Sequence, residues 1–308
     1  MSAVGGSERG PGVHVGPNHE PLLEEAVRAG GGRVVPLSEA SGLVYRGSDE
    51  PGEVVAMLHP GIRWVQLCHA GVERWTANDL VTREPVWTSA AGAYSLQVAE
   101  HALALLLAAA RDLPAAARAT SWEPKRTRSL ARSTVALVGA GGIARSLAAL
   151  LEPLGCRLLA VSDSGPFPGA ERTVPRASYR DVLGEADHVV LTAPSTAQTR
   201  GMVGAAELAL MKPTAWLVNV ARGDLVVTDD LLDALDAGVV AGAALDVTDP
   251  EPLPPGHPLW THPRVLVTPH SANPDDAYWP TLAGRVEENV RRFGAGEPLV
   301  AVIEPGGF

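Results

Sequence analysis

A continuous apolar run, a glycine-rich turn and a helix follow one another near the middle of the chain, and this succession restricts the fold more than any other feature. Val135–Val138 is typical of a strand buried on both faces, and a tight turn at Gly139 follows it. Gly141 lets the backbone approach a pyrophosphate, and Ala144 is small enough for the helix to pack closely on the strand. The helix N-terminus adds free amide groups and a positive dipole. The pattern therefore predicts a dinucleotide-binding unit, whose turn contacts the cofactor through Gly139, Ala140, Gly141, Gly142 and Ile143.

Short β-rich segments alternate with helical segments on both sides of this turn. We expect strands at 13–15, 33–35, 43–45, 63–67, 135–138, 157–161, 188–191, 215–218, 239–245 and 265–267. Strands that are separated by helices pair in parallel through right-handed crossovers, which is the α/β class. The 308 residues, 46% of them hydrophobic and 19% charged, exclude a disordered chain and suffice for two domains with their own cores.

Two helices indicate how the domains are connected. An apolar helix is expected from about Ser95 to Arg111, and a final amphipathic helix from about Pro280 to Phe293 should cross back to the N-terminal portion. We therefore expect two Rossmann-like domains, each a doubly wound parallel sheet, with an interdomain cleft. The dinucleotide-binding domain, 96–282, is inserted into a flavodoxin-like substrate domain that consists of 1–95 and 283–308.

Composition and charge exclude several classes of partner. The net charge of −10 argues against a nucleic-acid or anionic-membrane binder, because both need a basic surface. Cys68 and Cys156 are too few for a disulfide scaffold or a four-thiolate metal site, so we expect reduced thiols, no metal and a cytoplasmic location. The apolar run 102–110 is about half a membrane span, and Met1–Pro11 is expected to be a flexible leader rather than an export signal. The basic segment 112–132 is expected to be a solvated loop or a subunit contact.

The segment after the second strand of the dinucleotide-binding unit normally reads the ribose. Asp163 lies 24 residues after Gly139, and a carboxylate there accepts hydrogen bonds from ribose hydroxyls and repels a 2′-phosphate, which favours NAD. Alternatively, Asp163 points to solvent and Ser162 takes the ribose position, which leaves NADP possible. The nearest arginine downstream is Arg172.

Three polar residues follow buried strands in the C-terminal half: Arg222 after 215–218, Glu251 after 239–245 and His270 after 265–267. Ligands of open parallel sheets bind outside the carboxyl ends of the strands, so these side chains are candidates for one site. Taken singly, each residue also has a non-functional interpretation: Arg222 as a surface arginine, Glu251 as a solvated glutamate and His270 as a hydrogen-bonded loop histidine.

These residues belong to a series of motifs that resembles the D-isomer-specific 2-hydroxyacid dehydrogenase family, which includes phosphoglycerate dehydrogenases and glyoxylate/hydroxypyruvate reductases. The matching stretches fall in order between about 70 and 275: Val98–Leu103, Gly139–Ala144, Thr199–Gly201, Leu210–Pro213, Asn219–Gly223, Asp246–Leu253, His257–Trp260 and Thr268–His270.

The resemblance implies a role for each matching residue. His270 would protonate the carbonyl oxygen during reduction, and Glu251 would orient its imidazole. Arg222 would bind the carboxylate or carbonyl of a 2-oxo acid, and Asp246 would lie near the nicotinamide carboxamide. The backbone of Ala70, Gly71 and Val72 resembles the loop that binds the substrate carboxylate. The implied cofactor contacts beyond the glycine turn are Ser162, Asp163, Pro194, Thr199, Val220, Ala221, Asp246 and His270.

Some positions depart from the family pattern, and others have two possible roles. Ser162 stands where many NAD-dependent relatives carry aspartate, and Thr192–Pro194 lacks the histidine of the usual version. Arg46 is expected to contact an anionic substrate tail or to form a surface salt bridge. Trp279, with Tyr278, lines the pocket or packs in the core.

The sequence therefore predicts a nicotinamide-dependent oxidoreductase that transfers hydride between the cofactor and a small D-2-hydroxy acid or 2-oxo acid, acting as a 2-oxo-acid reductase. It would use NAD, with NADP possible, and form a homodimer. Two alternatives stay open: an NAD(H)-sensing, corepressor-like interaction protein, and a dehydrogenase of a small inorganic anion such as phosphite.

Overall fold

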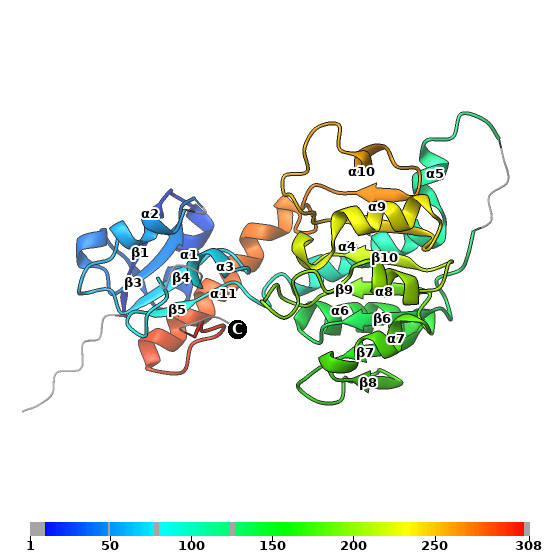
Figure 1. Ribbon diagram of the computed structural model, residues 1–308. Coiled ribbons are helices and arrows are strands. Elements are labelled where there is room, and N and C mark those ends of the chain that lie inside the picture. Colours follow the sequence, from blue (N-terminus) through cyan, green and yellow to red (C-terminus); the bar gives the residue numbers. More distant parts are fainter. Residues whose placement is uncertain (1–9, 49, 77–79, 123–126, 305–308) are drawn as a thin grey trace, which may run out of the picture. The chain divides into compact units, whose positions relative to one another are not determined.

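The computed structural model describes residues 10–48, 50–76, 80–122 and 127–304. Most of the expected leader, and Lys125 and Arg126 of the basic segment, lie outside these ranges. The chain divides into two compact units (Figure 1): a first unit of 1–94 and 275–308, and a second unit of 95–274. Each unit is built around its own sheet, as expected for the α/β class.

The first unit contains five parallel strands in the order β2-β1-β3-β4-β5. The strands are β1 (Gly12–Pro17), β2 (Arg33–Val34), β3 (Gly42–Arg46), β4 (Trp64–Leu67) and β5 (Val86–Thr88). The helices are α1 (Pro21–Ala29), α2 (Pro51–Ala56), α3 (Glu73–Thr76) and α11 (Asp275–Ala295). This strand order is that of flavodoxin-like sheets, and it confirms the predicted fold class for this unit.

The last helix, α11, begins at Asp275 and not near Pro280, which lies inside it. Asp275 and Asp276 supply acidic side chains to the observed first turn, where they complement the helix dipole. The whole helix belongs to the first unit, so the division between the units falls at 274/275, whereas we expected the substrate domain to resume at 283.

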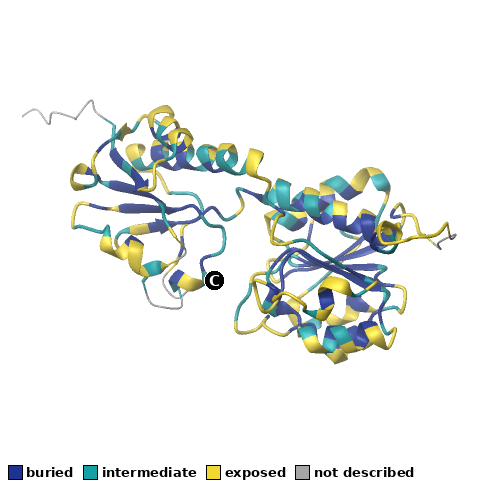
Figure 2. Ribbon diagram, turned by 90° about the horizontal axis from the view of Figure 1, so that it is seen from above, coloured by how far each residue is buried: buried dark blue, intermediate teal, exposed yellow. Residues whose placement is uncertain are grey.

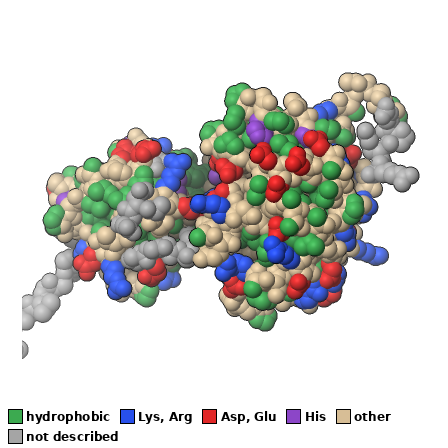
Figure 3. Space-filling model, in the orientation of Figure 1, with side chains coloured by type: hydrophobic (Ala, Val, Ile, Leu, Met, Phe, Trp, Pro, Cys, Tyr) green, Lys and Arg blue, Asp and Glu red, His purple; other side chains and the backbone are tan. Residues whose placement is uncertain are grey.

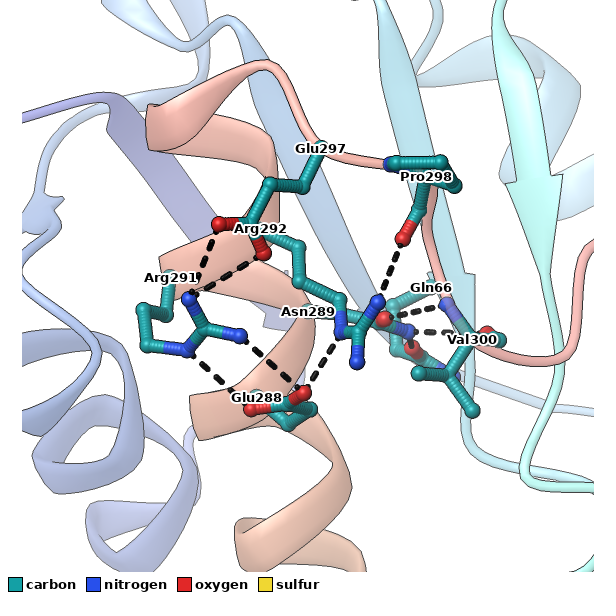
Figure 4. A network of polar contacts seen from close by, with 8 residues as sticks. All are labelled: Gln66, Glu288, Asn289, Arg291, Arg292, Glu297, Pro298 and Val300. Carbon is teal, nitrogen blue, oxygen red and sulfur yellow. Dashed lines mark hydrogen bonds and ion pairs between the residues drawn. The ribbon is translucent and has the colours of Figure 1, made fainter.

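A buried polar network joins α11 to the sheet of the first unit and to the C-terminal segment (Figure 4). Asn289 is fully buried, and its Nδ2 donates to Gln66 Oε1 at 2.8 Å and to the Val300 carbonyl at 3.1 Å. Its Oδ1 accepts from the Val300 amide, while Thr88 donates to Gln66 Oε1. Because each of these buried groups has a partner, the network specifies how the returning helix seats on the sheet.

The second unit contains seven parallel strands in the order β12-β11-β10-β9-β6-β7-β8. The strands are β6 (Thr134–Val138), β7 (Arg157–Val161), β8 (Arg172–Val174), β9 (His188–Leu191), β10 (Trp216–Asn219), β11 (Gly242–Leu245) and β12 (Val265–Val267). The helices are α4 (Ser95–Ala110), α5 (Leu113–Ala117), α6 (Gly142–Leu151), α7 (Arg180–Leu183), α8 (Ala205–Leu210), α9 (Thr228–Asp236) and α10 (Pro258–Thr261). The strand order reverses between β6 and β9, the position at which doubly wound sheets bind ligands.

The sheet of the second unit is buried on both faces, as the continuous apolar strands predicted (Figure 2). One core cluster lies between the sheet and the pair α4 and α6, and the other lies under α7, α8 and α9. Helix α4 is apolar, as predicted, but it is only partly buried, because Leu96 and Leu107 are exposed on it. No helix in the described ranges is long and apolar enough to span a membrane. The visible face in Figure 3 carries acidic and basic side chains interspersed over each unit.

His188, the first residue of β9, makes the second unit sensitive to acid. Burial lowers the pKa of His188 to about 4, Asp187 opposes the shift, and the Nδ1 atom has no hydrogen-bond partner among the described residues. The unfolded chain binds a proton at His188 below about pH 6.5, whereas the folded chain excludes it until about pH 4. The contribution of neutral, buried His188 to the free energy of unfolding is therefore fully present above pH 6.5 and declines as the pH falls from 6.5 to 4.

We expect the free energy of unfolding to fall by about 2 kcal/mol between pH 7 and pH 5 from this one group. Urea unfolding of the wild type and of His188→Leu at the two pH values measures the difference. The leucine variant should lose that part of the pH dependence. Equal pH dependence in the two proteins would show that His188 is not the acid-sensitive group.

Candidate active site

The glycine turn between β6 and α6 has the geometry that a dinucleotide requires. Gly139 has a φ of +121°, and a Cβ built on it would lie 2.7 Å from the Ala193 backbone nitrogen. This position therefore needs glycine both for its backbone conformation and for the close approach to the loop after β9. A Cβ built on Gly141 would meet no described atom within 4 Å, so this side of the turn is open. Helix α6 begins at Gly142, and the amides of its first turn lack intrahelical acceptors, so the turn fits a diphosphate.

Asp163, which follows β7, pairs with Arg176, which follows β8, and the sequence did not indicate this pair. Asp163 Oδ1 accepts from the Arg176 amide at 2.7 Å, and Asp163 Oδ2 accepts from Arg176 Nε at 3.1 Å. The hydrogen bonds from the backbone and side chain of Arg176 lower the pKa of Asp163. Ser162 is nearly buried, and its hydroxyl lies 3.1 Å from that of Ser164. Arg172, the arginine nearest in sequence, instead pairs with Glu185.

His270 and Glu251 are in direct contact. His270 Nδ1 lies 2.6 Å from Glu251 Oε1, and both side chains are partly exposed, at 54% and 41%. A carboxylate can only accept a hydrogen bond, so Nδ1 carries a proton and donates a hydrogen bond to Glu251. This assigns the outer nitrogen, Nε2, as the atom available for proton transfer to a ligand.

Arg222 follows β10 in a turn that the Asn219 side chain closes. The Ala221 amide donates to Asn219 Oδ1 at 3.0 Å, and Asn219 Nδ2 donates to the Arg222 carbonyl at 2.8 Å. The next residue, Gly223, lies against the loop after β11, since a Cβ there would come within 1.9 Å of the Thr248 carbonyl oxygen. Glycine at this position thus lets the Arg222 loop pack directly on the loop that carries Glu251.

Asp246 is buried at the end of β11 and contacts the loop that carries His270. Burial raises the pKa of its carboxyl group, but hydrogen bonds from His101, Thr268 and the Ser271 amide outweigh this effect and the pKa is lowered. The sequence analysis included His101 only within the matching stretch 98–103 and gave it no role. Its contacts could not be predicted because they join residues about 150 positions apart in the chain.

The remaining predicted cofactor residues lie in the loops after β9 and β10, and they differ in how far they are buried. Thr199 is buried and donates to the Pro194 carbonyl at 2.7 Å, so its hydroxyl closes the loop after β9. Pro194 itself is exposed. Val220 and Ala221 are nearly buried beside Arg222.

The predicted substrate residues Arg46, Ala70, Gly71, Val72 and Trp279 all lie in the first unit, whereas Arg222 and the His270–Glu251 pair lie in the second. Arg46 ends β3, and its guanidinium lies 4.8 Å from the centroid of the Trp279 ring and 3.7 Å from Glu20. Arg46 therefore has both an aromatic and an acidic neighbour. The Val72 side chain is fully buried in the core, so only its backbone is a candidate for ligand contact. Tyr278 stacks on Tyr94 at 5.0 Å, which is a packing role.

Comparisons with known proteins agree with this geometry. The family model described as the NAD binding domain of D-isomer specific 2-hydroxyacid dehydrogenases matches residues 103–272. A glyoxylate reductase/hydroxypyruvate reductase of Mus musculus is 32% identical over 75% of this chain and 74% of its own length. A protein of Corynebacterium melassecola, described as an uncharacterized protein in the proB 3′ region, is 39% identical over 91% of this chain and 94% of its own. The crystal structure of a D-isomer specific 2-hydroxyacid dehydrogenase from Xanthobacter autotrophicus, in complex with NADPH and MES, has a TM-score of 0.82 with 28% identity and covers 96% of this chain and 98% of that one.

Proposed function

Because this chain belongs to the D-isomer-specific 2-hydroxyacid dehydrogenase family, an NAD(P)-dependent group of oxidoreductases, we propose that it reduces a small 2-oxo acid to the D-2-hydroxy acid. The observation that carries the proposal is the 2.6 Å contact between His270 Nδ1 and Glu251, in the same unit as the glycine turn. A histidine held in this way is a proton donor, which reduction of a carbonyl needs.

The reduction adds a hydride to the carbonyl carbon and a proton to its oxygen. A reduced nicotinamide, when bound, would supply the hydride and be oxidised to NAD(P)⁺. His270 donates the proton from Nε2 to the forming alkoxide, and Glu251 stabilises the imidazolium before this transfer by accepting a hydrogen bond from Nδ1–H. The backbone amides at the start of α6 would hold the diphosphate of the cofactor.

We assign binding of the substrate carboxylate to Arg222. Arg222 presents a planar guanidinium, which suits bidentate binding of the carboxylate of a 2-oxo acid. We propose the first unit as the substrate domain, with the backbone of Ala70–Val72 binding the carboxylate and with Arg46 and Trp279 contacting the rest of the substrate. The second unit is the cofactor domain.

Arg176 is proposed to favour NADPH over NADH. Asp163 is already bonded to Arg176 through both oxygens, and Ser162 and Ser164 add two hydroxyls to the same turn. An arginine near the ribose accommodates a 2′-phosphate, and the similar Xanthobacter protein was crystallised with NADPH. This proposal reverses the preference for NAD that Asp163 suggested in the sequence alone.

We expect NADPH to bind about tenfold more tightly than NADH, and Arg176→Gln to remove that difference. Fluorescence titration of the protein with each cofactor measures both dissociation constants without any substrate. Arg172→Gln, which alters an arginine paired with Glu185, is the matched control and should retain the preference. Tighter binding of NADH by the wild type would contradict the proposal.

A substrate panel tests the function itself. Oxidation of NADPH and NADH is followed with glyoxylate, hydroxypyruvate, pyruvate and longer 2-oxo acids, and reduction of NAD(P)⁺ is followed with phosphite. Turnover of a 2-oxo acid supports the proposal. Cofactor binding without turnover of any of these acids would favour an NAD(H)-sensing interaction protein, and turnover of phosphite alone would favour the inorganic-anion dehydrogenase. A homodimer and a cytoplasmic location stay predictions from the sequence.

A further inference from the structure

The loop that carries His270 is attached to Asp246 on both sides of the histidine. Asp246 Oδ1 accepts from Thr268 Oγ1 at 2.6 Å and from the Ser271 amide at 2.9 Å, while Oδ2 accepts from the Ala272 amide at 3.1 Å. The Asp246 carbonyl also accepts from the His270 amide at 2.8 Å. One buried residue therefore holds the whole segment 268–272.

This attachment holds His270 in an unusual backbone conformation. Its φ is +50°, in the left-handed region that residues with a side chain rarely adopt. Such a conformation costs about 1 kcal/mol or more and persists only where the surrounding structure determines it. The hydrogen bonds to Asp246 are the contacts that flank it.

His101, on α4, completes the hydrogen-bond chain. Its Nε2 lies 3.0 Å from Thr268 Oγ1 and 3.3 Å from Asp246 Oδ1, and its side chain is 21% exposed. The Thr268 hydroxyl has one proton, and with it donates a hydrogen bond to the Asp246 carboxylate at 2.6 Å. The hydroxyl oxygen must then accept from His101, so Nε2 is the protonated nitrogen.

We propose that His101 is a positioning residue for His270: its Nε2–H group, acting through Thr268 and Asp246, holds the 268–272 loop in the conformation that presents the proton donor. The expected effect of His101 on turnover rests on the proposed function, whereas its expected effect on the 268–272 loop does not. His101 touches neither His270 nor Glu251 in the contacts described, so its influence is indirect.

The experiment compares His101→Leu, which removes the donor, with His101→Gln, whose amide can still donate to Thr268. His59→Leu is the matched control, because it removes a histidine that bonds a backbone carbonyl, that of Leu37, in the first unit. Hydrogen exchange of the amides of 270–272 reports on the loop without any substrate. Steady-state kinetics with the preferred 2-oxo acid report separately on kcat and KM.

In His101→Leu we expect these amides to exchange about tenfold faster and kcat to fall about tenfold, with KM and the cofactor dissociation constant within about twofold of the wild type. His101→Gln should restore kcat to within about threefold of the wild type, and His59→Leu should change neither exchange at 270–272 nor kcat.

Unchanged hydrogen exchange at 270–272 in His101→Leu would overturn the proposal. An equal loss of kcat in His101→Leu and His101→Gln, with both variants folded, would also overturn it. A wild type that turns over no 2-oxo acid would instead contradict the proposed function, and the exchange measurement would still decide the role of His101.

Discussion

Replacing His270 by asparagine is expected to lower kcat by about three orders of magnitude while the dissociation constant for NAD(P)H stays within about twofold. Asparagine can still donate from its amide toward Glu251, so the loop after β12 keeps that contact. It has no group that releases a proton at neutral pH, so the forming alkoxide loses its donor. Steady-state kinetics and fluorescence titration of the cofactor measure the two quantities on the same preparation.

His257→Asn is the matched control for this variant. His257 lies in the same unit, and its Nδ1 accepts from the Leu259 amide at the start of α10, a capping role that asparagine also fills. This variant should keep wild-type kcat. If His270→Asn retained more than about a tenth of the wild-type kcat, His270 would not be the proton donor.

Replacing Arg222 by glutamine is expected to lower kcat/KM for the 2-oxo acid by about three orders of magnitude, because the substrate carboxylate loses its bidentate cation. The guanidinium donates to the Ala221 carbonyl at 2.6 Å, but the turn should survive because Asn219 bonds both the Ala221 amide and the Arg222 carbonyl. Arg222→Lys keeps the charge without the planar fork, so its kcat/KM should fall between those of the wild type and the glutamine variant.

Arg200→Gln provides the control for the arginine series. Arg200 is an exposed arginine of the same unit that pairs with Asp224, and its replacement should change kcat/KM by less than about twofold. Kinetics over a range of 2-oxo acid concentrations separate KM from kcat. Wild-type kcat/KM in Arg222→Gln would remove Arg222 from the substrate site.

Local sequence patterns were enough to predict the parts of the fold that depend on neighbouring residues. Val135–Val138 reads as a strand buried on both faces because every residue is apolar, and the structure buries all four. The glycine turn was recognisable from its glycines and from its place between a strand and a helix, and the structure shows a steric requirement for glycine at Gly139. The start of α11 was expected at about Pro280, whereas the helix begins at Asp275, with two aspartates in its first turn.

The sequence proposed the residues of the candidate site but could not show the contacts between them. Arg222, Glu251 and His270 each follow a strand, which a sequence shows, and the resemblance to a family supplied their roles. The pairing of Asp163 with Arg176 was not visible, because Arg176 follows an edge strand, β8, that no sequence pattern indicated. The contacts of Asp246 with the 268–272 loop needed the register of β11 beside β12.

By itself, the sequence therefore determined the α/β class and the glycine turn of the dinucleotide-binding unit, and it predicted which residues transfer a proton and bind an anion, because these follow from apolar patterning, glycine sterics and side-chain chemistry. The tertiary structure alone decided which nitrogen of His270 faces Glu251, which arginine pairs with Asp163 and how His101 reaches the His270 loop. Those are contacts between residues far apart in the chain, and the packing of strands and helices, rather than any local pattern, brings their atoms within hydrogen-bond distance.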